Sequence, residues 1–287
     1  MTNSKVVQHE TVRHIDPRLA FETACFSDPG ALDRYLAHAT GSLKVLRPEF
    51  SANTGSALLT GPDRPLARAD LDVLWHDGGR VVVHDHVPGT PYFANGVVVD
   101  GRLCLTDTWR CYSLDEGPRS LLTAVVNVLP DADEVTLLRD RLQPLAAATT
   151  QGDGPVCFEA VVGGDQVKVV KFAHRIAGAP LPGLCSLLGI RGQSGREAET
   201  PDGYVADYAF TVRRSGTLRG FTGLDEVRRL PSYREDLFMP TPGDRVERTV
   251  GEGGGAAILL RHADQSTLLA DLAFLQELNR SGVFVVD

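Results

Sequence analysis

The sequence contains few lysines, and its charge balance is acidic. Only four of its 29 basic residues are lysine, namely Lys5, Lys44, Lys168 and Lys171. A site that requires an ammonium group therefore has few candidates. The net charge of −8 makes nucleic acid and anionic membrane surfaces unfavourable partners.

Paired cysteines and long apolar runs are also missing. The five cysteines are an odd number without a Cys-x-x-Cys pair, so we expect neither a disulfide framework nor a structural zinc site. Apolar runs such as 256–260 are far shorter than the roughly 20 residues that span a bilayer. No long apolar stretch follows the first residues, so we expect no secretory signal and a cytoplasmic location.

The remaining composition indicates a globular chain with both helices and strands. A length of 287 residues suffices for two domains or for one domain with two lobes. Helical periodicity at 28–39 and 133–150 alternates with strand-like segments, and Asp100-Gly101 between two of these predicts a hairpin. Because strands and helices are mixed, we expect an α+β or α/β protein.

A basic residue before a proline is followed by a small polar loop. Arg47 and Pro48 end a strand-like segment, and the loop runs from Asn53 to Ser56. Backbone N–H groups of such loops can cradle an anion, and a guanidinium can bind phosphate bidentately. The alternative is an ordinary surface turn, because small polar loops are common.

A second strand-like segment contains His84, Asp85 and His86. The two histidines share one face of a strand and can offer two metal ligands, but no third ligand lies nearby in the sequence. A histidine with a near-neutral pKa is also a natural general base, so His84 is a proton-transfer candidate. The alternative is a simple strand at a sheet edge.

Four charged residues gather on a hairpin that spans 156–175. Glu159 lies on its first strand, and Lys171, His174 and Arg175 lie at the end of the second. Alternate residues of a strand share a face, so Lys171 and Arg175 can point into one cleft. There Lys171 should pair with the carboxylate of Glu159. The alternative is a ladder of surface ion pairs, which contributes little to stability.

The order of these segments resembles the ATP-grasp superfamily, in particular carboxylate–amine ligases similar to L-amino-acid ligases and biotin carboxylase. The resemblance begins near residue 5 and covers almost the whole chain. Arg47 to Ser56 match the phosphate-binding strand and loop, and His84 and Asp85 match the paired acids along the adenine. Glu159 and 171–175 match the metal site, and 216–221 and 242–246 match C-terminal lid segments.

The resemblance implies an α+β, two-lobed ATP-grasp-like fold whose antiparallel sheets enclose a cleft. We expect residues 1–85 to form a small lobe and residues 86–287 a large lobe with the lid segments. The N-terminal domain of the family is expected to be absent. The resemblance also assigns Arg47, Asn53, Ser56 and Asp85 to cofactor binding.

Four positions depart from the family pattern, one of them being His84 in place of one of the paired acids at the adenine. Arg47 replaces the phosphate-binding lysine, Lys171 the second metal-binding glutamate, and Ala173 the metal-binding asparagine. Because Mg²⁺ requires hard oxygen ligands, an ammonium at position 171 predicts that Mg²⁺ does not bind at the usual site. ATP can still bind through Arg47, and whether it is consumed stays open.

The leading hypothesis is a diverged ATP-grasp-like enzyme of small-molecule or natural-product biosynthesis with C–N ligase ancestry. Its partner would be a small carboxylate- or phosphate-bearing substrate. The catalytic candidates are Glu159, Lys171, Arg175, His174 and His84. Two alternatives stay open: an ATP-independent cyclase, isomerase or hydrolase that reuses the cleft, and a non-catalytic subunit. We expect a homodimer or a partner that supplies the missing domain.

Overall fold

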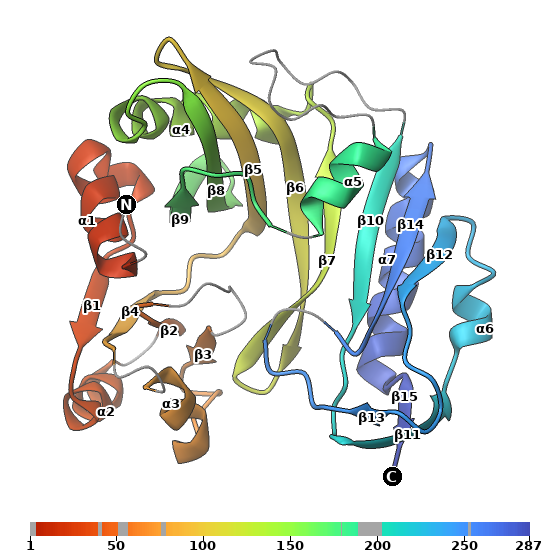
Figure 1. The fold of residues 1–287 in the computed structure, drawn as a ribbon. Coiled ribbons are helices and arrows are strands. Elements are labelled where there is room, and N and C mark those ends of the chain that lie inside the picture. Colours follow the sequence, from red (N-terminus) through yellow and green to blue (C-terminus); the bar gives the residue numbers. More distant parts are fainter. Residues whose placement is uncertain are drawn as a thin grey trace.

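The fold is dominated by one large antiparallel sheet (Figure 1). The computed structural model describes residues 4–39, 42–50, 57–75, 79–178, 180–188, 203–251 and 254–287. Within these ranges, twelve strands join in the order β1-β4-β2-β3-β7-β6-β5-β8-β9, while β10, β14 and β12 branch from β7. The strands of this sheet are β1 (Thr23–Phe26), β2 (Lys44–Pro48), β3 (Leu58–Thr60), β4 (Val81–Asp85), β5 (Thr90–Val99), β6 (Arg102–Glu116), β7 (Arg119–Val128), β8 (Gly154–Gly163), β9 (Gln166–Ala173), β10 (Tyr204–Phe210), β12 (Tyr233–Phe238) and β14 (Ala256–His262).

A smaller sheet and several helices complete the structure. The small sheet has the order β13-β11-β15. Its strands are β11 (Gly216–Phe221), β13 (Arg245–Val246) and β15 (Phe284–Val286). The helices are α1 (Lys5–Ile15), the 3₁₀ helix η1 (Pro17–Leu19), α2 (Pro29–His38), α3 (Arg68–Leu74), α4 (Asp133–Thr149), α5 (Leu181–Leu187), α6 (Leu224–Val227) and α7 (Gln265–Ser281). No described helix has both the length and the apolar character needed to cross a membrane.

Local sequence signals account for several of these elements. Asp28 caps α2 by accepting a hydrogen bond from the Ala31 N–H, and Pro29 takes the first helical position. Asp100 (φ 49°) and Gly101 (φ 74°) form the turn between β5 and β6, where a left-handed backbone favours this pair of residues. The large sheet is antiparallel and is accompanied by helices, so the expected α+β class with antiparallel sheets is confirmed.

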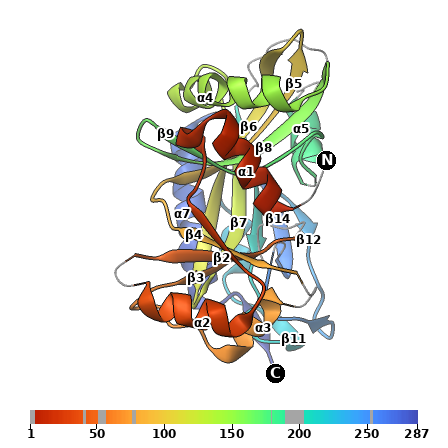
Figure 2. The ribbon, with the colours of Figure 1, turned by 90° about the vertical axis from the view of Figure 1, so that its left-hand side faces the viewer.

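The end of the large sheet formed by β1, β4, β2 and β3 has its own apolar cluster. This cluster includes Leu32 of α2, Leu74 of α3 and Val83 of β4. A single paired position, Leu58 opposite Arg119, connects β3 with β7. The proposed lobe boundary after residue 85 stays a prediction, and α1 lies against β9 rather than within this cluster (Figure 2).

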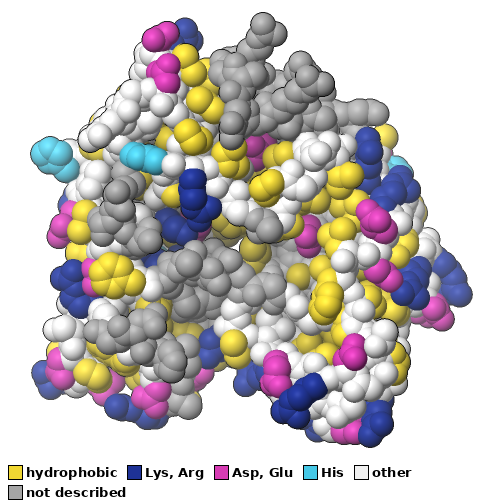
Figure 3. Space-filling view, in the orientation of Figure 1, with side chains coloured by type: hydrophobic (Ala, Val, Ile, Leu, Met, Phe, Trp, Pro, Cys, Tyr) yellow, Lys and Arg dark blue, Asp and Glu magenta, His cyan; other side chains and the backbone are white. Residues whose placement is uncertain are grey.

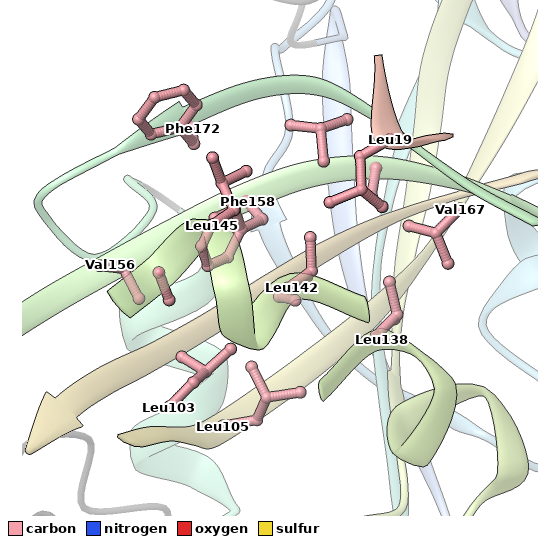
Figure 4. Packing of buried hydrophobic residues seen from close by; sticks show 14 of the residues in the cluster. Leu19, Leu103, Leu105, Leu138, Leu142, Leu145, Val156, Phe158, Val167 and Phe172 are labelled. Carbon is pink, nitrogen blue, oxygen red and sulfur yellow. The ribbon is translucent and has the colours of Figure 1, made fainter. Parts of the chain in front are cut away.

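The largest apolar cluster lies between α4 and the strands β5, β6, β8 and β9. Leu138, Leu142 and Leu145 of α4 face Leu103 and Phe158 of the sheet (Figure 4). Burial of these side chains fixes the β8–β9 hairpin against the helix, since removing apolar area from water is the main stabilising contribution to a core.

Two helices cover opposite faces of the other half of the sheet. Val125 and Val205 pack with Leu181 and Leu184 of α5, whereas the next residues in the strands, Val126 and Ala206, belong to the cluster that includes Leu272 of α7. Neighbouring residues of a strand point to opposite faces, so α5 and α7 sandwich β7, β10 and β14 (Figure 1).

Candidate functional site

A cavity of about 550 Å³ lies on the face of the sheet that α5 covers. This volume falls in the range of small-molecule sites. Side chains from β5, β7, β8, β9, β10, β12 and β14 contribute to its wall, together with the segment after β9. Most lining residues are apolar, and the charged ones are Glu159, Lys171, Arg175 and Asp207.

Glu159 and Lys171 face each other across the β8–β9 hairpin. They are direct register partners, and Lys171 Nζ donates to Glu159 Oε1 at 3.3 Å. Only 15% of the Glu159 side chain and 17% of the Lys171 side chain are exposed, so this is not an exposed surface pair. The ion pair expected from the hairpin is therefore present, and it lies in the wall of the cavity.

Glu159, Lys171 and Ala173 do not form a ligand set that fits a magnesium ion. Mg²⁺ takes near-octahedral oxygen ligands and usually one or two carboxylates. The carboxylate of Glu159 is already bound to an ammonium. Ala173, which lies opposite Cys157 two pairs further along the hairpin, carries no side-chain oxygen. A cation at this position would have to approach Lys171 against charge repulsion.

Lys5 joins this site from the first turn of α1, and it was missing from the sequence-based candidates. Its side chain is only 2% exposed, and its Nζ donates to the carbonyl of Pro48 at 3.1 Å. Burial, followed by the positive charges of Arg47 and Lys171, lowers the pKa of Lys5 to about 7. Lys5, Arg47 and Lys171 therefore form a cation cluster that connects α1, β2 and β9.

Glu49 anchors the start of α1 beside this cation cluster. Its carboxylate accepts hydrogen bonds from Ser4 Oγ and from two nitrogens of Arg80, and its backbone carbonyl accepts from the Lys5 N–H. The hydrogen bonds from Arg80 lower the pKa of Glu49, so the carboxylate stays charged. The position of Lys5 is thus set by hydrogen bonds at the end of β2.

His84 is not among the residues that line the cavity. Its ring packs 4.2 Å from that of Phe21 and 6.2 Å from that of His9, measured between ring centroids. Only 4% of His84 is exposed, and burial followed by the charge of Arg47 lowers its pKa to about 3. His84 is therefore neutral near pH 7 and shielded from solvent by α1 and the segment after it.

The other sequence-based candidates occupy different surroundings. Arg175 lines the cavity, whereas His174 is exposed just beyond β9 and its ring packs against Phe172. Asp85 accepts hydrogen bonds from Lys44 and Ser42 at 2.6 and 2.7 Å, and the bond from Lys44 lowers its pKa. Asn53 and Ser56 lie outside the described residues.

Asp207 is a second site residue that the sequence analysis missed. It lies in the middle of β10, opposite Val125 of β7 and Leu259 of β14, and it lines the cavity. Burial raises the pKa of its carboxyl to about 6. An acidic residue among the apolar residues of a central strand is the sequence signal that points to it, because charged residues are rarely buried without a reason.

A buried polar network holds the segment that follows Arg175. Asn95 Oδ1 accepts from the Ala177 N–H at 2.9 Å, and Asn95 Nδ2 donates to Asp107 Oδ1 at 2.6 Å. Trp109 Nε1 donates to the same Asp107 oxygen at 2.5 Å. The network joins β5 and β6 to the loop that carries Arg175, so it restricts where that guanidinium can lie.

Replacing Asn95 with alanine should destabilise the protein by about 1–3 kcal/mol, because the Ala177 N–H and Asp107 lose a buried partner. Urea denaturation measures this loss, and amide hydrogen exchange should show faster exchange at Ala177. Asn279→Ala is the control: Asn279 is buried beside Thr211, far along the chain, and its loss should leave local exchange at Ala177 unchanged. Unchanged stability and exchange in Asn95→Ala would contradict the assignment.

The fold of the chain is similar to that of several solved structures. No family model and no curated protein sequence matches the chain. An L-amino acid ligase from Bacillus licheniformis has a TM-score of 0.71 at 16% identity, over 99% of this chain and 73% of that chain. A carboxyaminoimidazole ribonucleotide synthase from Aspergillus clavatus, complexed with ATP, has a TM-score of 0.64 at 12% identity, over 97% and 73%. A biotin carboxylase from Campylobacter jejuni has a TM-score of 0.58 at 10% identity, over 99% and 67%.

Proposed function

The chain has the ATP-grasp fold, and on that basis we propose that it is a diverged enzyme of small-molecule or natural-product biosynthesis with C–N ligase ancestry. It would bind ATP and a carboxylate- or phosphate-bearing substrate. The observation that carries the proposal is the cation cluster of Lys5, Arg47 and Lys171, of which Lys171 lines the cavity.

The cation cluster is suited to an anion. Three positive groups near one another repel, and the lowered pKa of Lys5 reflects burial first and then this repulsion. Glu159 and Glu49 offset part of the positive charge. A phosphate group among the three cations would favour the charged form of Lys5, so anion binding and protonation of Lys5 reinforce each other.

Residues of the cation cluster and of the cavity wall have proposed roles. Arg47 holds a phosphate, since a guanidinium binds two oxygens at once. Lys171, oriented by Glu159, stabilises negative charge that develops on the reacting group, and Arg175 holds the carboxylate of the substrate. Bound ATP would supply a phosphoryl group, and His84 and His174 stay predictions for proton transfer.

A second candidate function is an ATP-independent enzyme that uses the same cavity. The Glu159–Lys171 ion pair favours it, because a carboxylate and an ammonium 3.3 Å apart occupy the place where the resemblance expects metal ligands. Such a pair can bind and polarise a substrate without a metal ion. Nucleotide binding separates this candidate from the first.

Calorimetric titration with ATP, with and without Mg²⁺, tests the proposal. We expect ATP to bind in both conditions, and Arg47→Ala to weaken binding by about tenfold or more, since hydrogen bonds to charged groups contribute about 1.5–3 kcal/mol. Arg102→Ala is the matched control, because Arg102 is exposed at the start of β6. If the unmodified protein binds no ATP in either condition, the ATP-independent candidate replaces the first.

A further inference from the structure

Asp207 places a carboxylate in a part of the cavity that is otherwise apolar. The side chains that β7, β12 and β14 contribute around it include Leu122, Val125, Phe238 and Ala257. Figure 3 shows hydrophobic side chains gathered over the region of β12 and β14 on this face. A charged group here is costly unless something pairs with it, because transfer of an ion from water to an apolar site is strongly unfavourable.

Nothing in the described part of the chain pairs with this carboxylate. No described side chain or backbone N–H donates a hydrogen bond to the carboxylate of Asp207. Among the described residues, burial is the cause of its raised pKa. Lys171 and Arg175 line the same cavity, yet their charges do not offset the burial of Asp207. The cavity therefore holds Glu159, Lys171 and Arg175 on and just after the β8–β9 hairpin, and on β10 it holds the carboxylate of Asp207, which these charges do not compensate.

We propose that Asp207 binds a protonated nitrogen of the substrate, so that the cavity accepts a molecule with an anionic group at one end, a basic nitrogen at the other and an apolar spacer between them. The anionic end rests on the proposed function, whereas the basic end rests on Asp207 alone. The spacer follows from the apolar side chains that make up most of the cavity wall.

This arrangement discriminates against substrates that lack a basic nitrogen. A substrate without the basic nitrogen would leave the partly buried carboxylate of Asp207 unpaired, and sites built around a polar group reject analogues that lack its partner. When the substrate carries the protonated nitrogen, a charge-assisted hydrogen bond to Asp207 compensates for the water that the carboxylate has lost. Asp207 is thus a specificity-determining residue rather than a structural one.

Binding of the nitrogen should also depend on pH. As the pH falls through about 6, the carboxyl of Asp207 takes up a proton and loses its attraction for a cation. The titratable groups that share the cavity are Cys157, Glu159, Lys171 and Arg175, while the lining residues from β7, β12 and β14 carry no titratable side chain. Acidification should therefore weaken binding of the basic nitrogen, because it protonates Asp207.

The test uses two pairs of simple acids that differ only in a terminal amino group. These are ε-aminocaproate with caproate, and γ-aminobutyrate with butyrate. Calorimetry on the full chain at pH 7 should show that at least one of the two amino acids binds about tenfold more tightly than its parent acid. A preference of this size is expected for a hydrogen bond between charged groups. Asp207→Asn should abolish that preference without weakening binding of the parent acid.

Three controls keep the outcome decisive. Asp131→Asn, at an exposed position outside the cavity, should leave the preference unchanged, and Asp207→Ser repeats the test in case the asparagine variant folds poorly. In the unmodified protein the preference should shrink between pH 7 and pH 5, and in both Asp207 variants it should be absent throughout. ATP titration of the same samples reports separately on the proposed function.

Two results would overturn the inference. One is an amino-group preference that persists in both Asp207 variants. The other is a protein that binds no amino acid of either pair more tightly than its parent acid, whether or not it binds ATP. Because ATP binding is scored independently, loss of the proposed function and loss of this inference can be told apart.

Discussion

Lys171→Glu should convert the Glu159–Lys171 ion pair into a divalent-cation site and should destabilise the protein when no such cation is present. The two positions are direct register partners on β8 and β9, so the new carboxylate faces that of Glu159. Two like charges about 4 Å apart repel by about 4 kcal/mol at an effective dielectric constant of about 20. Hard cations such as Mg²⁺ and Mn²⁺ bind oxygen ligands and would relieve this repulsion.

Thermal unfolding of Lys171→Glu with and without Mn²⁺ measures both effects. We expect a lowered melting temperature without the metal and a marked increase when it is added, whereas the unmodified protein should respond little. Lys171→Gln is the control, because it removes the ion pair without adding a carboxylate, and it should gain no response to Mn²⁺. An equal response in the two variants would show that the two carboxylates do not act together.

Lys5→Met should stabilise the protein at pH 7 and should weaken ATP binding. The pKa of Lys5 falls from 10.5 to about 7, and each pKa unit corresponds to about 1.4 kcal/mol. The charged form is therefore disfavoured in the folded protein by up to about 5 kcal/mol. Loss of the hydrogen bond to Pro48 offsets about 1 kcal/mol, so we expect a net gain of a few kcal/mol.

The pH dependence of stability provides a second readout for Lys5. Between pH 7 and about 10.5 the unfolded chain keeps its proton on Lys5 while the folded protein has released it. The unfolded state then binds more protons, so stability rises with pH in the unmodified protein. This contribution should be missing from Lys5→Met when urea denaturation is repeated across that range.

Lys168→Met is the matched control for this experiment. Lys168 also donates to a backbone carbonyl, that of Ala20 at 2.9 Å, but it lies outside the cation cluster. Its replacement should cost a little stability and leave ATP affinity unchanged. The role assigned to Lys5 would be wrong if Lys5→Met lowered stability as Lys168→Met does and still bound ATP normally.

The effects expected for the Lys5 and Asp207 variants reflect one property that the two residues share. Lys5 and Asp207 are charged groups held in surroundings that disfavour their charge, and such residues are commonly found where a protein binds a ligand. If their ligands have opposite charge, as proposed, binding removes the unfavourable interactions. Stability gained by replacing them and function lost in the same variants would then be two results of one cause.

The sequence by itself determined the local structure and one contact of the site. Asp28, Pro29 and the Asp100-Gly101 turn carry local signals that the structure follows. The Glu159–Lys171 pair could be predicted because it lies within one hairpin, where strand alternation and a short turn bring the two side chains together.

Only the tertiary structure decided the position of α1 and the cation cluster. The buried residues of α1 are Lys5, Gln8, His9 and Val12, which have helical spacing but are mostly polar, so apolar periodicity did not reveal the helix. Lys5, Arg47 and Lys171 are far apart in the chain, and their proximity depends on how α1 and β2 pack near β9. The same holds for Asp207, because its partial burial is set by strands β7 and β14 and not by its neighbours in sequence.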